Sequence, residues 1–128
     1  MGKYIYLLIL SVFTLQGYSQ ITTTANGNAN QLAQILAGNG VTVSNVVLTC
    51  PNGAAGTFTT STCNLGMTQG VILTTGNVNT VAGPNINGSS GIDNSGGGDS
   101  DLDNLTSNIT YNAAVLEFDM QVLSDSVE

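Results

Sequence analysis

The sequence predicts a mainly β fold, with antiparallel sheets in a sandwich or jelly-roll arrangement and one or two short helices. Short runs rich in Val, Ile, Thr and Phe recur along the chain between Gly- and Asn-rich turns, a pattern typical of strands. From Ala114 to Leu123, apolar residues alternate with residues that include Glu117 and Asp119. This period of two predicts a strand with one face on a core and the other in water.

The N-terminus is typical of a secretory signal peptide over residues 1–19. Lys3 provides a short cationic region, Tyr4 to Phe13 is an apolar stretch, and small residues precede a cut before Gln20. The apolar stretch is shorter than the ~20 residues needed to span a bilayer. We therefore expect export to the cell surface or the medium, and no direct membrane insertion after the signal is cleaved.

The first element of the mature chain is expected to be an extended, Thr-rich segment that ends near Ala25. A short helix follows between Asn28 and Ala37, where apolar residues recur at helical spacing. Asn28 or Asn30 is suited to cap the start of this helix, and Gly38 is suited to end it. The apolar stripe of the helix should face the core.

Three strands are expected next, at Val41 to Leu48, Gly56 to Thr60 and Gly70 to Gly76. The third has a continuous apolar run, which predicts burial on both of its faces. Val78 to Ser95 is rich in Asn and Gly and predicts a long surface loop.

The regular strand at Ala114 to Leu123 lies almost at the end of the sequence. Because such a strand needs partners on both sides, we expect residues 20–128 to be the N-terminal part of a larger β domain, truncated at its C-terminus.

Charge is distributed very unevenly along the chain. Lys3 is the only basic residue, all eight acidic residues lie between Asp93 and Glu128, and the formal net charge is −7. A chain with this balance cannot neutralise phosphates, which excludes nucleic acid as a partner. The sequence contains no His, so the usual general base and the usual transition-metal ligand are both missing.

The acidic run Asp99, Asp101 and Asp103 follows three glycines and has two main interpretations. Alternate carboxylates resemble the first half of a calcium-binding loop, and weak oxygen-only sites suit the calcium supply outside cells. However, Asn104 stands where such a loop needs Gly, and Thr110 where it needs Glu.

The other interpretation is a helix start. Asp99 would cap a short helix, with the next two carboxylates near its positive end and with Leu102 and Leu105 facing inward. A solvated loop is a third alternative, and the sequence leaves all three open.

Cys50 and Cys63 are the only cysteines. An even number in an exported chain favours a structural disulfide, which would contribute about 3 kcal/mol for a loop of this size. Reduced thiols or half of a metal site are the alternatives, although neither has a supporting CxxC spacing or a His.

Seven stretches, in this order, form a recognisable pattern: Gln31–Leu36, Gly40–Val46, Gly56–Phe58, Asn64–Met67, Gly70–Gly76, Gly98–Leu102 and Ala113–Asp119. With them the chain resembles the choice-of-anchor L domain of secreted proteins from Bacteroidetes-type bacteria, over nearly all of its mature part. The resemblance implies that members carry one of several C-terminal anchoring or sorting signals, and it supplies no catalytic residues. Such bacteria use an Asp-Ser/Thr-aliphatic site for O-glycosylation, which Ser126 matches.

We therefore expect a non-enzymatic module of an exported cell-surface protein, serving in adhesion, surface architecture or display. No cofactor is required, and calcium is a candidate stabilising ion. The expected partner is a surface ligand or a neighbouring domain of the same protein. The alternative is an ancillary domain of an extracellular carbohydrate-active or other hydrolytic enzyme. Two carboxylates such as Asp101 and Glu117 could in principle form a glycosidase pair, although nothing in the sequence places them across a cleft.

Overall fold

The computed structural model describes residues 21–61, 63, 65–85, 87–88 and 91–123. The predicted signal peptide at residues 1–19 and the predicted glycosylation site Ser126 lie outside this part of the chain. Within it, no helix is long and apolar enough to cross a membrane.

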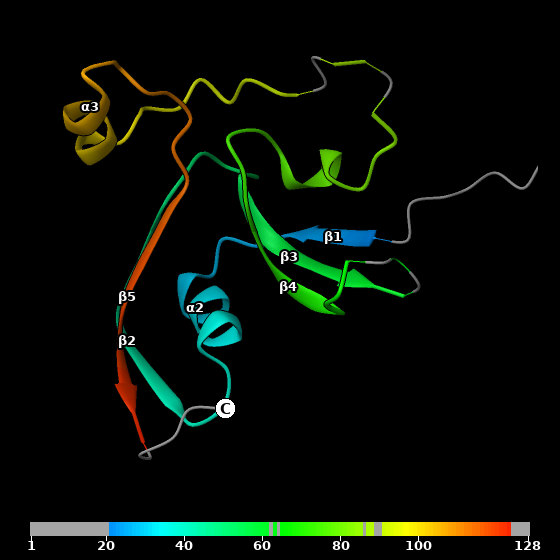
Figure 1. The fold of residues 1–128 in the computed structure, drawn as a ribbon, viewed down its shortest axis with the longest axis vertical. Coiled ribbons are helices and arrows are strands. Elements are labelled where there is room, and N and C mark those ends of the chain that lie inside the picture. The colour runs from blue at the N-terminus through cyan, green and yellow to red at the C-terminus, as the bar shows by residue number, and fades with distance from the viewer. Residues whose placement is uncertain (1–20, 62, 64, 86, 89–90, 124–128) are drawn as a thin grey trace, which may run out of the picture.

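One sheet contains three antiparallel strands in the order β1-β3-β4 (Figure 1). Its strands are β1 (Ile21–Ala25), β3 (Ala55–Thr60) and β4 (Gln69–Leu73). The Thr-rich segment predicted to be extended is thus an edge strand, paired with β3 along its whole length. Gly56 allows this close pairing, because a Cβ at that position would overlap the backbone of Thr24.

The second sheet pairs β2 (Val41–Thr49) with β5 (Val115–Val122), also antiparallel. The register runs from Val41 opposite Val122 to Thr49 opposite Val115, and it shifts between Ser44 and Val47. Asn45 lies at this irregularity with a positive φ of 51°, a conformation that Asn tolerates better than most residues. Both strands were predicted from their apolar patterns, and both are confirmed.

The helix α2 (Ala29–Ala37) lies between the two sheets (Figure 1). Asn28 caps it as predicted, since the Asn28 side chain accepts a hydrogen bond of 3.1 Å from the Gln31 backbone N–H. Gly38 ends it at a φ of 72°, in the left-handed region that favours glycine. The helix contacts β2, β4 and β5, and so joins the sheets.

The core is small. In the described part of the chain it consists of seven buried apolar residues: Leu32, Ala33, Val41, Ala54, Ala55, Phe58 and Val78. Together, the two antiparallel sheets and the two short helices confirm the predicted mainly β, sandwich-like fold.

Two details of the prediction are wrong. The strand β4 is not buried on both faces: Val71 and Ile72 are half-buried and Leu73 is 40% exposed. The reason is that β4 is an edge strand of its sheet. The predicted surface loop after Gly76 also contains a short 3₁₀ helix, η1 (Val78–Thr80), and Val78 is fully buried in the core.

Candidate functional site

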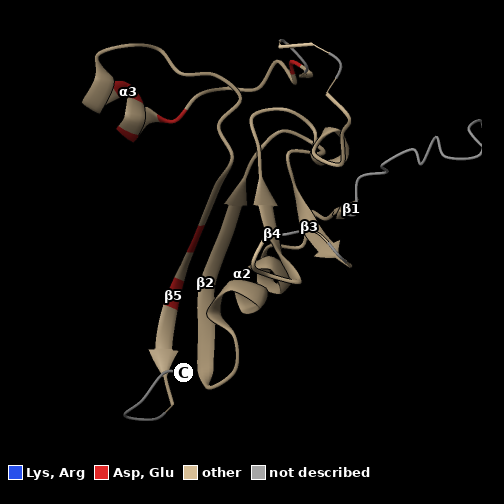
Figure 2. Ribbon diagram, turned by 45° about the vertical axis from the view of Figure 1, so that its right-hand side comes forward, with Lys and Arg blue, Asp and Glu red and all other residues tan. Residues whose placement is uncertain are grey.

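The acidic segment, residues 93–113, forms a separate lobe beyond the N-terminal start of β5, and it contains helix α3 (Ser100–Thr106), as Figures 1 and 2 show. Asp99 is the N-cap of α3. Its carboxylate accepts hydrogen bonds from the backbone N–H groups of Asp101, at 3.0 Å, and Leu102, at 2.9 Å. Asp101 and Asp103 lie in the first turn, where the helix dipole favours negative charge. The helix-start interpretation is therefore confirmed.

Asp103 closes the lobe through Thr110. Its Oδ1 atom accepts hydrogen bonds from both the backbone N–H and the hydroxyl of Thr110, each at 2.6 Å. The Thr110 hydroxyl oxygen also accepts from the Asp99 backbone N–H, at 2.9 Å. Thr110 thus links the start of α3 to the segment that follows the helix, a role that the sequence pattern did not indicate.

The glycines before the acidic run let two backbone segments lie against each other. The backbone N–H of Asn112 donates to the Gly96 carbonyl at 3.1 Å, and that of Ala113 donates to the Gly97 carbonyl at 3.0 Å. A Cβ on Gly98 would overlap the carbonyl oxygen of Thr110. The glycine run therefore serves close packing, for which its small size was the only sequence signal.

Asp93 anchors the beginning of the lobe. Its carboxylate accepts hydrogen bonds from the Asn112 side-chain amide, at 2.9 Å, and from the Ser95 backbone N–H, at 2.8 Å. These bonds, that of Asn112 first, lower the pKa of Asp93 below its ordinary value, and desolvation opposes them only in part.

Two predictions for this lobe differ from the structure or stay open. Leu102 and Leu105 do not face inward: they are 48% and 82% exposed, and α3 contains no buried residue. Within the described residues, no group of three or more acidic or Cys side chains is placed to hold a metal ion. Calcium binding by Asp99, Asp101 and Asp103 stays a prediction, and the hydrogen bonds that Asp99 accepts favour the helix start.

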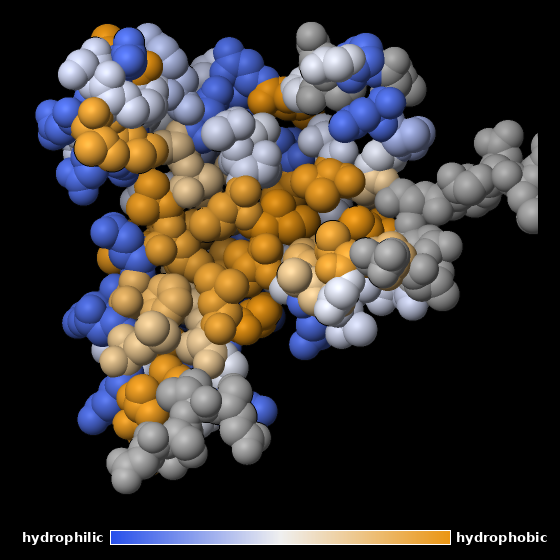
Figure 3. All heavy atoms as spheres, in the orientation of Figure 1, coloured by the Kyte–Doolittle hydropathy of each residue, from blue (hydrophilic) through white to orange (hydrophobic). Residues whose placement is uncertain are grey.

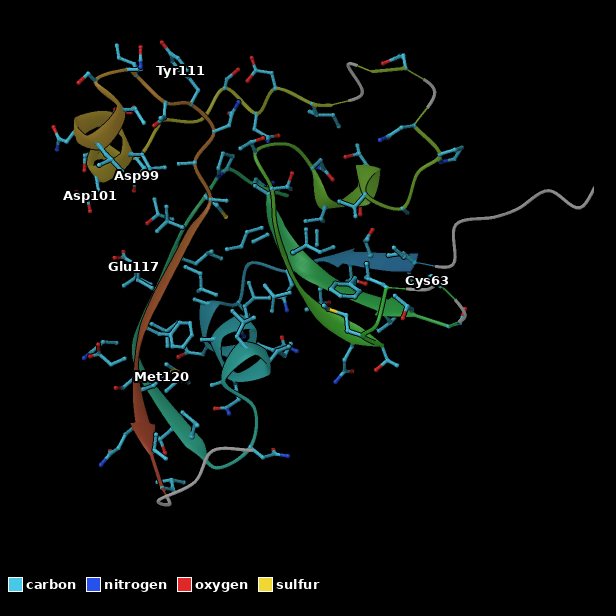
Figure 4. The ribbon with its side chains drawn as sticks, in the orientation of Figure 1. Cys63, Asp99, Asp101, Tyr111, Glu117 and Met120 are labelled. Atoms are coloured by element: carbon cyan, nitrogen blue, oxygen red, sulfur yellow. The ribbon has the colours of Figure 1, made fainter. Side chains whose placement is uncertain are left out.

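Two open cavities flank the glycine run. The larger, of about 790 Å³, is lined by Asp93, Asp103 and Tyr111 among others, and Tyr111 is 67% exposed. The smaller, of about 360 Å³, is lined by Asp99 and Glu117 among others. Asp101 lines neither cavity, and Figure 4 shows it on α3 while Glu117 lies on β5.

The predicted disulfide is not formed in the structure, where Cys50 and Cys63 are both free thiols. Cys50 directly follows β2, and a turn in which the Ala54 N–H donates to the Pro51 carbonyl leads from it to β3. Cys63 lies three residues beyond the end of β3 (Figure 4). Six extended residues of β3 span about 17 Å, whereas a disulfide needs Cα atoms within about 7 Å. Burial raises the pKa of the Cys50 thiol.

The fold and this lobe define a small two-sheet antiparallel domain whose acidic end is held together by its own carboxylates. Comparison with protein families matches the model of the choice-of-anchor L domain over residues 20–128. The chain therefore belongs to the choice-of-anchor L domain family. No significant match was found among curated proteins or among solved structures. The family is a non-catalytic type of module in exported or surface-associated proteins, which confirms the surface-associated part of the prediction.

Proposed function

We propose that this chain is a non-enzymatic module of an exported cell-surface protein, where it serves in adhesion, surface architecture or display. Family membership supports the surface-associated role. The non-enzymatic part of the proposal is supported by the hydrogen bonds that the carboxylates accept. Asp93, Asp99 and Asp103 accept hydrogen bonds from their own lobe, so these three groups stabilise local structure.

The location can be tested on intact cells. The native gene product would carry an epitope tag within residues 87–88, which lie at the surface of a long connection. We expect antibody binding and protease cleavage of the tag on unbroken cells, to the same extent as after lysis. A periplasmic protein expressed in the same strain is the control. Signal that appears only after lysis would overturn the surface assignment.

The ancillary-domain alternative has one observation in its favour. Tyr111 is largely exposed and lines the larger cavity together with Asp93 and Asp103. An exposed aromatic ring beside hydrogen-bonding carboxylates is a combination that can contact a sugar. Calorimetric titration of soluble oligosaccharides into the protein and into its Tyr111→Ala variant tests this. Binding that Tyr111→Ala abolishes would favour the alternative, and no binding would favour the surface module.

A further inference from the structure

The chain contains four Asn-Gly pairs: Asn26-Gly27, Asn39-Gly40, Asn52-Gly53 and Asn87-Gly88. In such a pair the backbone nitrogen of the glycine can attack the side-chain carbonyl carbon of the asparagine, because glycine has no Cβ to hinder the approach. The attack requires a free asparagine side chain, a free glycine N–H and a backbone that can turn. The fourth pair is flanked by residues outside the described part of the chain, and the other three are held in different ways.

The side chain of Asn26 is fixed by two hydrogen bonds. Its Oδ1 atom accepts from the Asn28 backbone N–H at 2.9 Å, and its amide nitrogen donates to Oε1 of Gln31 at 2.8 Å. The Asn26 backbone N–H also donates to the Ala55 carbonyl, at 3.0 Å. Both ends of the side-chain amide must be released before its carbon can reach the Gly27 nitrogen, so this pair is protected.

The pair Asn52-Gly53 lies in a closed turn between β2 and β3. The Ala54 N–H donates to the Pro51 carbonyl at 3.1 Å, and the Val78 N–H donates to the Gly53 carbonyl at 2.9 Å. Because Val78 is fully buried, the second bond holds Gly53 against the core. The side chain of Asn52 is exposed, but the backbone that would have to turn is restrained on both sides of the pair.

The pair Asn39-Gly40 has no such restraint on its reacting groups. It lies in the connection between α2 and β2, at the end of the molecule opposite the acidic lobe (Figure 1). Both residues are exposed, and neither the Asn39 side chain nor the Gly40 N–H has a hydrogen-bond partner among the described residues. A Cβ built on Gly38 or Gly40 would meet nothing within 4 Å, so the backbone has room to turn.

The connection is held at its ends. The Gln34 side-chain amide donates to the carbonyl oxygens of Gly38 at 2.8 Å and of Val41 at 3.5 Å, one before the pair and one after it. The Leu123 N–H donates to the Gly40 carbonyl at 3.0 Å. All three bonds occupy carbonyl oxygens of the backbone, so the glycine nitrogen and the asparagine amide of the pair stay unbonded.

We propose that Asn39, and not Asn26 or Asn52, is a site of spontaneous deamidation in the folded chain, with water as the co-reactant. The Gly40 nitrogen loses its proton to a base in solution and bonds to the Asn39 side-chain carbon, while the amide nitrogen takes up a proton and leaves as ammonia. One water molecule then opens the cyclic imide at either of its two C–N bonds to the Gly40 nitrogen, which gives aspartate or isoaspartate. No electron is transferred.

The reaction joins two adjacent residues and therefore requires no partner surface. It is a property of the chain that goes beyond the proposed function and does not depend on where the protein is located. The cell-surface experiment and the deamidation experiment can thus fail separately.

The product would change the connection in two ways. A carboxylate would appear beyond the C-terminal end of α2, where the helix dipole disfavours negative charge, and residues 21–61 otherwise carry no charged side chain. Isoaspartate would also add one backbone atom between the two carbonyls that Gln34 bonds. Figure 3 shows apolar side chains gathered over α2 and the adjoining parts of both sheets, so α2 is fixed and the Gln34 bonds must absorb the change.

The test follows the full chain over time in mildly alkaline buffer prepared with water enriched in a heavy oxygen isotope. Samples are digested with pepsin in acid, where the glycine nitrogen keeps its proton, and each Asn-Gly peptide is analysed by tandem mass spectrometry. Heavy oxygen in the product identifies hydrolysis of the imide during the incubation. We expect Asn39 to react at least about tenfold faster than Asn26 or Asn52, because opening two hydrogen bonds slows a reaction by about that factor.

The unfolded chain and two variants are the controls. In concentrated urea the three pairs should react at similar rates, since the restraints of the folded state are lost. Asn39→Gln should give no product at this position, because its longer side chain would have to close a larger ring. Gln31→Ala removes the partner of the Asn26 amide, so Asn26 should react about threefold faster while Asn39 keeps its rate.

Three outcomes would overturn the proposal. Reaction of Asn26 or Asn52 as fast as that of Asn39 in the folded chain would show that hydrogen bonds do not select the site. A much slower reaction of Asn39 in the folded chain than in urea would show that its connection is restrained after all. An unchanged rate at Asn26 in the Gln31→Ala variant would contradict protection by its side-chain bonds. Circular dichroism of each variant verifies that it is folded.

Discussion

Gly98 has no room for a side chain, because a Cβ would overlap the carbonyl oxygen of Thr110, whereas a Cβ on Gly97 would meet open space. We expect Gly98→Ala to lower the free energy of unfolding by about 1–3 kcal/mol, as forced overpacking does. Gly97→Ala, the matched control, should leave it unchanged or raise it by up to about 1 kcal/mol. Urea denaturation measures both, and equal effects would contradict the packing role of Gly98.

Asp93 provides a test of pH dependence at the same scale. Its folded-state pKa is lowered from 3.8, chiefly by Asn112. The stabilisation from Asp93 is therefore fully present above its unfolded pKa and is lost as the pH falls through the lowered folded pKa. Asn112→Gly removes the amide but tolerates the positive φ of 55° at this position. We expect NMR titration to show a higher pKa for Asp93 in this variant, and an unchanged pKa would contradict the assignment.

At the scale of elements, α3 depends on its cap because it buries no residue. Asp99→Ala removes two hydrogen bonds to the first turn and should destabilise the helix by about 1 kcal/mol. Asp101→Ala also removes one negative charge near the helix start but no cap, so it should cost less. Hydrogen exchange of the α3 amides compares the two variants. Similar exchange rates would show that charge, and not the cap, is what matters.

The strand β3 keeps the two cysteines apart, which leads to a prediction about their chemistry. We expect two free thiols per chain when the unfolded protein is titrated with a thiol reagent without prior reduction. In the folded protein at pH 8, Cys50 should react more slowly than in the unfolded protein, because burial raises its pKa. Recovery of fewer than two thiols, together with a peptide linking Cys50 and Cys63, would show that the two cysteines do form a disulfide.

Sequence patterns predicted the strands and α2 well, because side-chain periodicity reports which residues share a face. The same patterns failed where another element was needed to cover that face. The apolar run of β4 predicted burial on both faces, but β4 lies at a sheet edge. Leu102 and Leu105 have helical spacing, yet α3 lies beyond the sheets and leaves them exposed. Periodicity shows which residues share a face, but it does not show whether another helix or strand packs on that face.

For the molecule as a whole, the candidate site was predictable only in part. The order of seven weak stretches indicated the family, and the choice-of-anchor L model matches residues 20–128. The position of Asp99 before a helical pattern indicated the cap. The link from Asp103 to Thr110 was not predictable, because it joins residues seven positions apart through a turn. Which Asn-Gly pair stays free of hydrogen bonds likewise depends on contacts with other segments, which no local pattern gives.

The charge of the whole molecule leads to the last prediction. Every charged side chain in the described residues is a carboxylate, so these groups repel one another at pH 7. Salt screens this repulsion, and NaCl should therefore raise the melting temperature. A gain of about 0.5 kcal/mol would correspond to about 2–4 °C in a domain of this size.

Calcium chloride at the same ionic strength separates general screening from a specific site. Asp99 and Asp103 already accept hydrogen bonds from their own lobe. We therefore expect calcium to raise the melting temperature no more than NaCl does. A larger rise with calcium, reduced by Asp101→Asn but not by Glu117→Gln, would instead establish a calcium site in the acidic run. Either variant removes one negative charge, so a difference between them reports the position of the carboxylate and not the total charge.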